Sequence, residues 1–488
     1  MGKQQKRPRE VELKLELPSA RADRIRKHPL LRGLRCRKRK MEARYFDTPS
    51  FDLSRSGFSL RVRSDGDRFV QTMKQTAGMA GIFDRNEWES NVDGFWPNFE
   101  SLQHTPLRHR RKLLRHVELV GRSAIERTSW NLERDRCAVE VALDLGRIEA
   151  GRRHESIAEL ELELKDGDTA FLFELAEQLA ECVPLRIGVL SKAQRVEILA
   201  RAKGGQAIKA GKIVLDPESN VARAFSLIAH SCVLHFRLNE ELIVERCDAA
   251  ALHQGRVSMR RLRAALSVFG KAIADSRLPD LKRELRWFTS SLSDGRDIDV
   301  FLKRYNDRLS RSDRRKLLSA RVAAYAAAHR SIDSDRFRTF VLSFLKWVET
   351  GSWRRSRKAR SAVKPFAARR LERQWRKVQA GGLALTSLDE EQQHRFRIEV
   401  KKMRYATEFL SSLFDPGKVQ TFVKTLEAMQ ECLGDLNDLV TARQLIEVHS
   451  LDFDLGDRPT RPKELSKTVK AFARLDRTGG FWAEARRR

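Results

Sequence analysis

Two segments of this chain alternate charged residues with aliphatic ones: EVELKLEL at 10–17 and AELELELK at 158–165. In a β-strand, residues of like parity share a face, so each segment would present one charged face and one aliphatic face. The charged faces would carry Glu10, Glu12, Lys14, Glu16, Glu159, Glu161, Glu163 and Lys165. Carboxylates at alternate positions suit hard cations such as Mg²⁺ or Mn²⁺, and neighbouring lysines suit phosphoryl oxygens.

Other short segments have the same design. Arg61 and Arg63 would project from one face of a strand, and Arg85, Glu87 and Glu89 from one face of another. A single strand of this kind is ordinarily half-buried, with its charged face in water. Several together favour a sheet closed into a barrel with its polar faces inward, where charges must be paired or bound to a ligand. A pore with both kinds of charge suits a metal-bound triphosphate.

A second set of basic residues recurs at helical spacing. The first copy consists of His253, Arg256, Arg260 and Arg263, which fall within one narrow stripe of a helix. The second copy consists of His394, Arg397, Lys401 and Arg404. A lone basic residue on a helix usually faces water, but two matching stripes predict two cationic surfaces that together follow a long anion.

The two stripes belong to an internal duplication. His253 and His394 are separated by 141 residues, and so are Asp297 and Asp438 (394 minus 253, and 438 minus 297). The same offset in two separated blocks indicates two copies of one helical unit. Period-two patterning dominates residues 10–165 and helical patterning begins near Asn220, with a glycine-containing linker between them.

Charge and cysteine content limit the function classes. Residues 1–200 hold 38 Lys/Arg against 31 Asp/Glu, and the remainder holds 58 against 35, so the net charge of +30 lies mostly in the second part. Such a field attracts nucleic acid, anionic membrane or an inorganic polyanion without choosing among them. The six cysteines are scattered, as expected for free thiols in a reducing compartment. Without a recognisable secretory signal or membrane span, we expect a cytoplasmic protein.

The first part of the chain resembles the CYTH, or triphosphate tunnel metalloenzyme, superfamily. EVELK at 10–14 resembles its E-x-E-x-K signature, and YFDTP at 45–49, LRVR at 60–63, QTMK at 71–74 and RNEWE at 85–89 follow in order. The match ends with ELELELK at 159–165 and SK at 191–192. The resemblance implies an eight-stranded antiparallel tunnel that cleaves or rearranges triphosphates with a divalent metal.

Carried over by position, the resemblance assigns roles to individual residues. It makes Glu10, Glu12, Glu161 and Glu163 the metal-binding carboxylates. It makes Lys14, Arg61, Arg63, Lys74, Arg127, Lys165 and Lys192 the substrate-binding cations. Arg85 is expected to line the tunnel and contact substrate, together with Glu87, Glu89, Glu140 and Asp144. The reaction itself is expected to depend on Glu10, Glu12, Lys14, Arg61 and Lys74.

The second part resembles the CHAD domain, whose H-x-x-R-[VI]-x-x-[RK]-[RK]-x-R hallmark occurs in both copies. The resemblance implies paired helical bundles with a basic groove for inorganic polyphosphate, and it adds Arg261 and Lys402 to the two stripes. Nucleic acid is the alternative partner. We favour polyphosphate because no tryptophan of this part interleaves with the stripes to stack on bases, although the basic run at 354–364 would give nonspecific affinity.

We therefore predict an α+β protein: a tunnel domain at 1–203, a linker at 204–215 and an all-α duplicated domain at 216–488. The predicted activity is hydrolysis of tripolyphosphate to diphosphate and phosphate with Mg²⁺ or Mn²⁺, in a protein that associates with polyphosphate granules. Thiamine triphosphatase, nucleotide triphosphatase and adenylate cyclase activities remain as enzymatic alternatives. The non-enzymatic alternative is a granule-binding protein with a vestigial tunnel. The oligomeric state is not predicted.

Overall fold

The computed structural model describes residues 9–66, 68–75, 82–109, 111–201, 205–455 and 461–483. The chain forms two compact units, one made of Met1–Gln206 with Asp335–Thr350 and the other of Ala207–Ser334 with Gly351–Arg488. Among the described residues, no helix is both long enough and apolar enough to cross a membrane.

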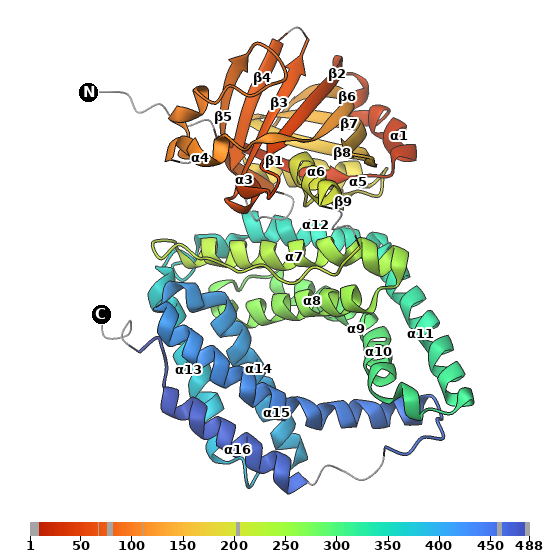
Figure 1. Cartoon of the computed structure of the whole chain (residues 1–488), viewed down its shortest axis with the longest axis vertical. Helices are drawn as coiled ribbons and strands as arrows, with labels where there is room; N and C mark the ends of the chain where they lie inside the picture. Colours follow the sequence, from red (N-terminus) through yellow and green to blue (C-terminus); the bar gives the residue numbers. More distant parts are fainter. Residues whose placement is uncertain are drawn as a thin grey trace. The chain divides into compact units, whose positions relative to one another are not determined.

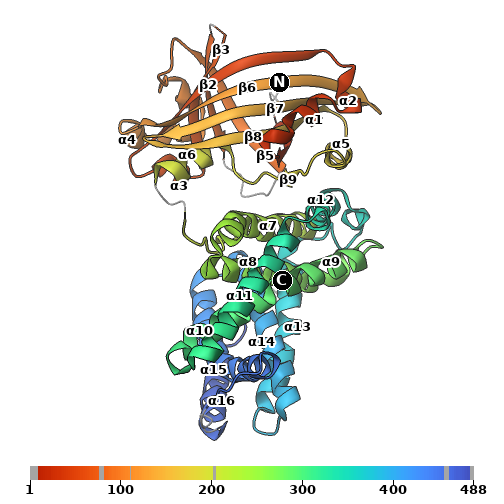
Figure 2. The same ribbon diagram turned by 90° about the vertical axis from the view of Figure 1, so that its right-hand side faces the viewer.

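The first unit contains one antiparallel sheet that closes on itself (Figures 1 and 2). Its strands are β1 (Arg9–Glu16), β2 (Cys36–Asp47), β3 (Phe58–Asp65), β4 (Arg68–Gln75), β5 (Ile82–Val92), β6 (Glu118–Arg134), β7 (Cys137–Ala150), β8 (Arg153–Asp166) and the short β9 (Arg186–Ile187). The order β5-β4-β3-β2-β6-β7-β8-β1 becomes a ring because β1 also pairs with β5. The predicted eight-stranded antiparallel tunnel is confirmed.

The register of the barrel separates charged and aliphatic residues as their parity predicts. Glu12 lies opposite Glu163 and Lys14 opposite Glu161 across β1 and β8, whereas Leu13 lies opposite Leu162. The leucines are fully buried on the outer face, where α5 (Thr169–Ala180) packs against both strands. An apolar exterior under a helix leaves the charged faces to line the interior.

The YFDTP segment organises the connection between β2 and β3. Asp47 is buried at the end of β2, and its carboxylate accepts hydrogen bonds from the backbone N–H groups of Thr48, Leu53 and Ser54 at 2.7, 2.9 and 3.0 Å. These bonds hold the short helix α3 (Asp52–Arg55) against the start of β3. The motif therefore positions the strand that carries Arg61 and Arg63.

The second unit is helical. Its helices are α7 (Val221–Arg246), α8 (Ala249–Phe269), α9 (Leu278–Ser291), α10 (Ser293–Tyr305), α11 (Arg311–Ile332), α13 (Val363–Leu383), α14 (Glu390–Leu410), α15 (Pro416–Val448) and α16 (Arg461–Thr478). The hairpin α7–α8 and the hairpin α13–α14 have the same design (Figure 1). Helices α8 and α14 begin 141 residues apart and end 141 residues apart (390 minus 249, and 410 minus 269). The offset between the two basic stripes is thus an offset between two equivalent helices.

One helix from the middle of the predicted helical domain belongs to the first unit. Helix α12 (Asp335–Thr350) packs against α5 and β9, and Lys346 Nζ lies 2.8 Å from a carboxylate oxygen of Glu177 on α5. Large side chains such as Phe344 and Trp347 are buried along it. The first unit is therefore assembled from two distant stretches of sequence.

We expect a fragment that ends at residue 203 to be less stable than one with residues 335–350 appended through a flexible linker. Loss of α12 uncovers apolar surface on α5, and each large apolar side chain is worth roughly 1.5–3 kcal/mol when buried. Urea denaturation of the two fragments should differ by at least about 3 kcal/mol, equivalent to two such side chains. Equal midpoints would show that α12 does not stabilise the tunnel unit.

Candidate active site and candidate anion groove

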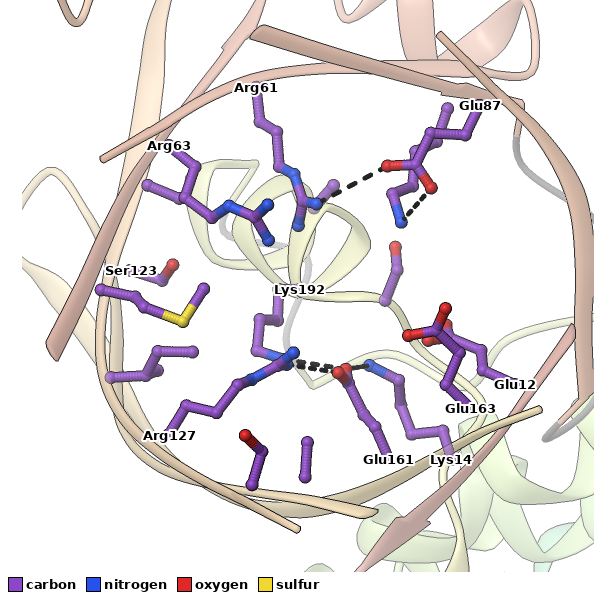
Figure 3. Close-up of a pocket in the computed structure, with 18 of the residues that line it drawn as sticks. Glu12, Lys14, Arg61, Arg63, Glu87, Ser123, Arg127, Glu161, Glu163 and Lys192 are labelled. Atoms are coloured by element: carbon purple, nitrogen blue, oxygen red, sulfur yellow. Dashed lines mark hydrogen bonds and ion pairs between the residues drawn. The ribbon is translucent and has the colours of Figure 1, made fainter. Parts of the chain in front are cut away.

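The interior of the barrel is a cavity of about 770 Å³. Every one of the eight long strands contributes side chains to its wall, and α6 (Lys192–Ala200) contributes Lys192 at its first residue. Figure 3 shows Arg61 and Arg63 entering from one wall and Glu12 and Glu163 from another. The sequence thus brings cations and carboxylates from distant segments into one space.

Part of this charge is held in a buried ionic cage. Asp144 and Glu159 are fully buried, and Lys192 Nζ contacts both, at 2.7 Å for Asp144. Glu161 takes part from the lumen side, with Lys14 Nζ at 2.7 Å and Lys192 Nζ at 3.0 Å. Arg127 completes the cage by contacting Asp144 and Glu161. Each buried carboxylate has a cationic partner, as burial requires.

The pKa values follow from this pairing. Burial opposes ionisation of Glu161, but Lys14, Lys192 and Arg127 outweigh it and hold the pKa of Glu161 well below its usual range. Burial likewise opposes the charged form of Lys192, but Asp144, Glu159 and Glu161 raise its pKa well above the usual range. Glu161 and Lys192 are therefore charged at neutral pH, and each has partners of opposite charge within the cage.

The tunnel offers two sets of carboxylates to a metal ion. The oxygens of Asp144, Glu159 and Glu161 lie within 4.8 Å of one another, but Lys192 already bridges all three. In the neighbouring row, Glu12 on β1 lies opposite Glu163 on β8. Three carboxylates adjoin there, because Glu163 also lies opposite Glu140 on β7, where Lys165 contacts both.

Like charges on directly opposed strand positions repel one another. Lys165 lies between Glu163 and Glu140, and a metal ion could lie between Glu163 and Glu12. All three carboxylates of this row line the cavity, and oxygen ligands of this kind suit Mg²⁺ or Mn²⁺. Glu12 and Glu163 are predicted metal ligands. Glu140 was expected only to line the tunnel, and its position opposite Glu163 makes it a third candidate ligand.

The wall formed by β3, β4 and β5 carries three cations, Arg61, Arg63 and Lys74. Lys74 Nζ lies 2.9 Å from Glu87, and Arg61 lies 3.9 Å from the same carboxylate. Glu87 thus holds two cations from different strands side by side, with Arg63 next along β3 (Figure 3). Arginine binds phosphoryl oxygens bidentately and lysine binds them as a point charge, so the wall can hold a multiply charged phosphate chain.

A second cavity lies in the helical unit, where the two basic stripes meet. It has a volume of about 370 Å³ and is lined by His253, Arg256, Arg260, Arg397 and Lys401 from the predicted set. A shallower hollow shares Arg260, Arg397 and Lys401 with it and adds Arg404 and Gln430. Because the two hollows share three cations, they form one continuous groove.

The electrostatics of the groove indicate an anion site. Burial, together with Arg296, Arg260 and Arg256, lowers the pKa of His253 to about 4, so this ring is neutral at pH 7. Arg256 is braced by Asp297 at 2.7 Å and by the carbonyl oxygen of Ser293 at 2.9 Å. The Nε atom of Arg260 is buried without a hydrogen-bond partner among the described residues. A buried donor of this kind is costly unless a ligand accepts from it.

Known protein families match both parts of the chain. The CYTH domain family matches residues 8–196, and the CHAD domain family matches residues 227–447. This chain is a CYTH–CHAD protein. The CYTH domain contains the tunnel, and the CHAD domain contains the groove between the duplicated stripes.

Three relatives illustrate the similarity. An inorganic triphosphatase of Haemophilus influenzae is 28% identical over 167 residues, which cover 32% of this chain and 44% of the relative, so the chain spans less than half the length of that protein. The crystal structure of the CHAD domain from Ricinus communis is 26% identical, covering 58% of this chain and 96% of that one, with a TM-score of 0.46. A Hippeastrum protein named for adenylyl cyclase, with a dominant triphosphatase activity, is 18% identical, covering 38% of this chain and 95% of that one, with a TM-score of 0.30.

Most of the residues predicted for the CYTH tunnel line it. These are Glu12, Lys14, Arg61, Arg63, Lys74, Arg127, Glu161, Glu163, Lys165 and Lys192. The backbones of Glu10 and Arg85 pair across β1 and β5, but their side chains lie outside the described residues. Arg37 and Arg39 on β2 also line the cavity and were not predicted. Their alternation within CRKRK was the available signal, but four basic residues in a row concealed it.

The CHAD residues divide differently. Arg261 lies away from the groove, 1% exposed, with its Nε donating to Glu408 at 2.6 Å. Lys402 contacts Glu399 at 2.6 Å, and neither Arg263 nor His394 is among the residues that line the two hollows. Arg296 and Arg304 line the larger hollow instead. Their spacing of eight residues on α10 places both on one helix face.

Proposed function

We propose that the CYTH domain hydrolyses inorganic triphosphate to diphosphate and phosphate with a divalent metal ion, and that the CHAD domain binds inorganic polyphosphate. The observation that carries the first part is the division of the tunnel wall. Glu12, Glu163 and Glu140 form a row of carboxylates in the lumen. Arg61 and Arg63 enter the same lumen from another wall than Glu12 and Glu163 (Figure 3). Distant homology to an inorganic triphosphatase supports the same activity.

The wall residues would divide the work of hydrolysis. Arg61, Arg63 and Lys74 would hold the phosphoryl oxygens and spread their negative charge as water adds to phosphorus and the anhydride bond breaks. Glu12 and Glu163 would hold Mg²⁺ or Mn²⁺, which would neutralise substrate charge and polarise a phosphoryl oxygen. The ion pairs around Lys192 would hold the lining side chains of the cage in place. These side chains would then need to move little when substrate enters.

The lumen favours an inorganic substrate over an organic triphosphate. Tyr45 is the single aromatic residue among the described residues that line the lumen. This side chain is 3% exposed, and its hydroxyl lies 3.3 Å from Ser123 Oγ. Among the lining residues that the structure describes, a nucleobase or a thiamine ring would therefore find no open aromatic face on which to stack.

We expect phosphate release from tripolyphosphate to exceed that from thiamine triphosphate and ATP by about tenfold or more in kcat/KM, equivalent to about 1.4 kcal/mol of transition-state binding. The measurement is phosphate release with Mg²⁺ and with Mn²⁺, and cyclic AMP is measured in parallel. Faster turnover of an organic triphosphate would identify that compound, and not tripolyphosphate, as the preferred substrate. No turnover of any substrate with either metal would leave polyphosphate binding alone.

The groove makes a separate prediction. Replacing Arg260 and Lys401 with Ala should weaken binding of long polyphosphate and reduce the slope of log affinity against log salt by about 1.4, or about 0.7 for each lost contact on a flexible strand. Tripolyphosphate turnover should not change. In the wild type, a bound polyanion should raise the pKa of His253 from about 4, so binding should tighten as pH falls towards that value. Single-stranded DNA of matched charge that binds as tightly would contradict polyphosphate specificity.

A further inference from the structure

A basic surface outside the groove is formed by the segment that connects α12 to α13 and by the first turns of α13. Residues 351–371 contain eight Lys/Arg and no Asp or Glu. Arg355, Arg357, Lys358, Arg360 and Lys364 are all exposed. None of these five forms an ion pair with any residue that the structure describes. We call this set, together with Arg369 and Arg370 on α13, the basic shoulder.

The basic shoulder is held in one conformation. Trp353 and Ala359 are buried at 2% and 0% exposure and anchor the segment in the core. The carbonyl oxygens of Ala359 and Ser361 accept hydrogen bonds from the first two N–H groups of α7, at 2.9 and 3.0 Å. Val363 N in turn donates to Ser219 at 3.0 Å. The exposed cations are therefore presented by a fixed backbone rather than by a flexible tail.

This arrangement is electrostatically unfavourable in the absence of an anion. The cations repel one another on a rigid frame, and Lys364 lies in the first turn of α13, where the helix dipole disfavours positive charge. The local field also acts on Arg370, whose pKa is lowered by burial and by the neighbouring Arg373. A bound polyanion would relieve all of these costs.

The shoulder continues the line of the groove. Arg370 donates from Nη2 to the carbonyl oxygen of Ser267 at 2.8 Å. Ser267 lies seven residues after Arg260 on α8, which is about 10 Å along the axis and nearly the same helix face. A hollow lined by Ala264, Ser267 and Arg370 lies between the two basic surfaces. One flexible chain could thus follow α8 from the groove to the shoulder.

The chemistry of the shoulder fits phosphate without bases. The aromatic rings beside it face the core: Trp353 packs edge-on against Phe225 with ring centroids 5.4 Å apart, and Phe366 stacks on Phe269 at 5.2 Å. No exposed ring is available among the described residues of this segment for stacking on a base. Three of the five exposed cations are arginines, and Lys358 lies beside one of them in the sequence. Arginine suits phosphoryl oxygens because its planar guanidinium group can bind two of them at once.

We propose that the basic shoulder is a second polyphosphate-binding surface, which engages the part of a long chain that extends beyond the groove. This inference rests on the proposed polyphosphate binding by the CHAD domain. Two linked contacts on one chain raise the effective concentration of the second contact, so the shoulder would add affinity for long chains only. Chains too short to leave the groove would bind without it.

The test replaces Arg355, Arg357 and Lys358 with Ala in the full-length chain. The matched control replaces the exposed Arg311, Arg314 and Arg315 of α11 and removes the same charge. With chains of roughly one hundred phosphates, we expect the shoulder variant to bind about tenfold more weakly than the control. Its salt slope should fall by about 2, from three contacts at about 0.7 each. With chains of roughly ten phosphates, the two variants should bind alike.

The outcomes separate this inference from the function on which it rests. Equal affinities of the shoulder and control variants for long chains would overturn the second surface while leaving the groove intact. A variant with Arg260 and Lys401 replaced by Ala should lose affinity for short and long chains alike, and failure there would overturn polyphosphate binding by the groove itself. If the shoulder variant loses single-stranded DNA binding as strongly as long-chain polyphosphate binding, the surface recognises nucleic acid and the proposal is wrong.

Discussion

Replacing Glu163 with Gln should lower tripolyphosphate turnover by at least about 100-fold while leaving the fold intact, because even an outer partner of a metal ligand is worth 10- to 100-fold. Glu163 lines the lumen between Glu12 and Glu140 in the strand register. Glu163 forms an ion pair with Lys165, whose side chain is 44% exposed. Loss of an exposed pair costs little stability, so the effect should fall on metal binding and turnover.

Glu161→Gln would be a poorer choice for this experiment. Glu161 contacts three cations in the buried cage, so its replacement would disturb the fold and the metal site together. The matched control is Glu126→Gln on the outer face of β6, where the carboxylate is 45% exposed. Turnover and Mn²⁺ affinity are measured for both variants. Turnover of Glu163→Gln within twofold of wild type at ordinary metal concentration would remove Glu163 from the metal site.

The second large effect concerns stability. Replacing Lys192 with Met should lower the free energy of unfolding of the tunnel unit by roughly 3–5 kcal/mol at neutral pH, because it leaves buried carboxylates without their partner. Asp144 and Glu159 are fully buried, and Lys192 contacts both. Lys165→Met is the control, since its ion pairs are partly exposed and should contribute less than about 1 kcal/mol.

The pH dependence of this effect has a definite sign. In the wild type, Lys192 helps to hold the pKa of Asp144 and of Glu161 below their ordinary values. Their contribution to stability is therefore present above the unfolded-state pKa of about 4 and is lost as pH falls further. Without Lys192, burial raises the carboxylate pKa values, and protonation relieves the penalty.

The difference between wild type and Lys192→Met should thus be largest near pH 7 and should narrow below about pH 5. Urea denaturation of the tunnel unit at a series of pH values measures it. A difference that stays constant from pH 7 to pH 4, or one below about 1 kcal/mol at pH 7, would mean that Lys192 does not balance the buried carboxylates.

Several features of the site could be predicted because they depend on local periodicity. Alternation along 10–17 and 158–165 separated lumen from exterior, since side chains alternate in any strand. The 141-residue offset likewise predicted two equivalent helices, and α8 and α14 have that spacing. In both cases the evidence is a repeated pattern of residue types, which can be read without knowing how distant segments pack together.

Other features depend on pairings between distant residues. The sequence predicted a set of tunnel carboxylates but did not divide them, so Glu161 was grouped with Glu163 as a metal ligand. The register places them in adjacent rows, where Glu161 meets Lys14 and Glu163 meets Glu12. Two residues of the same type and face thus have different partners: Glu161 contacts three cations of the buried cage, whereas Glu163 lies between two other carboxylates in the strand register.

The sequence alone determined which residues are charged, which share a face, and that two basic helices are copies of each other. These properties follow from the two- and 3.6-residue periods of strand and helix. The tertiary structure decided which charges neutralise one another, that Arg261 is buried against Glu408 while Arg296 lines the groove, and that α12 packs with the tunnel. The reason is that ion pairing and burial depend on distances between elements, and these distances are set by how the whole chain packs rather than by any local repeat.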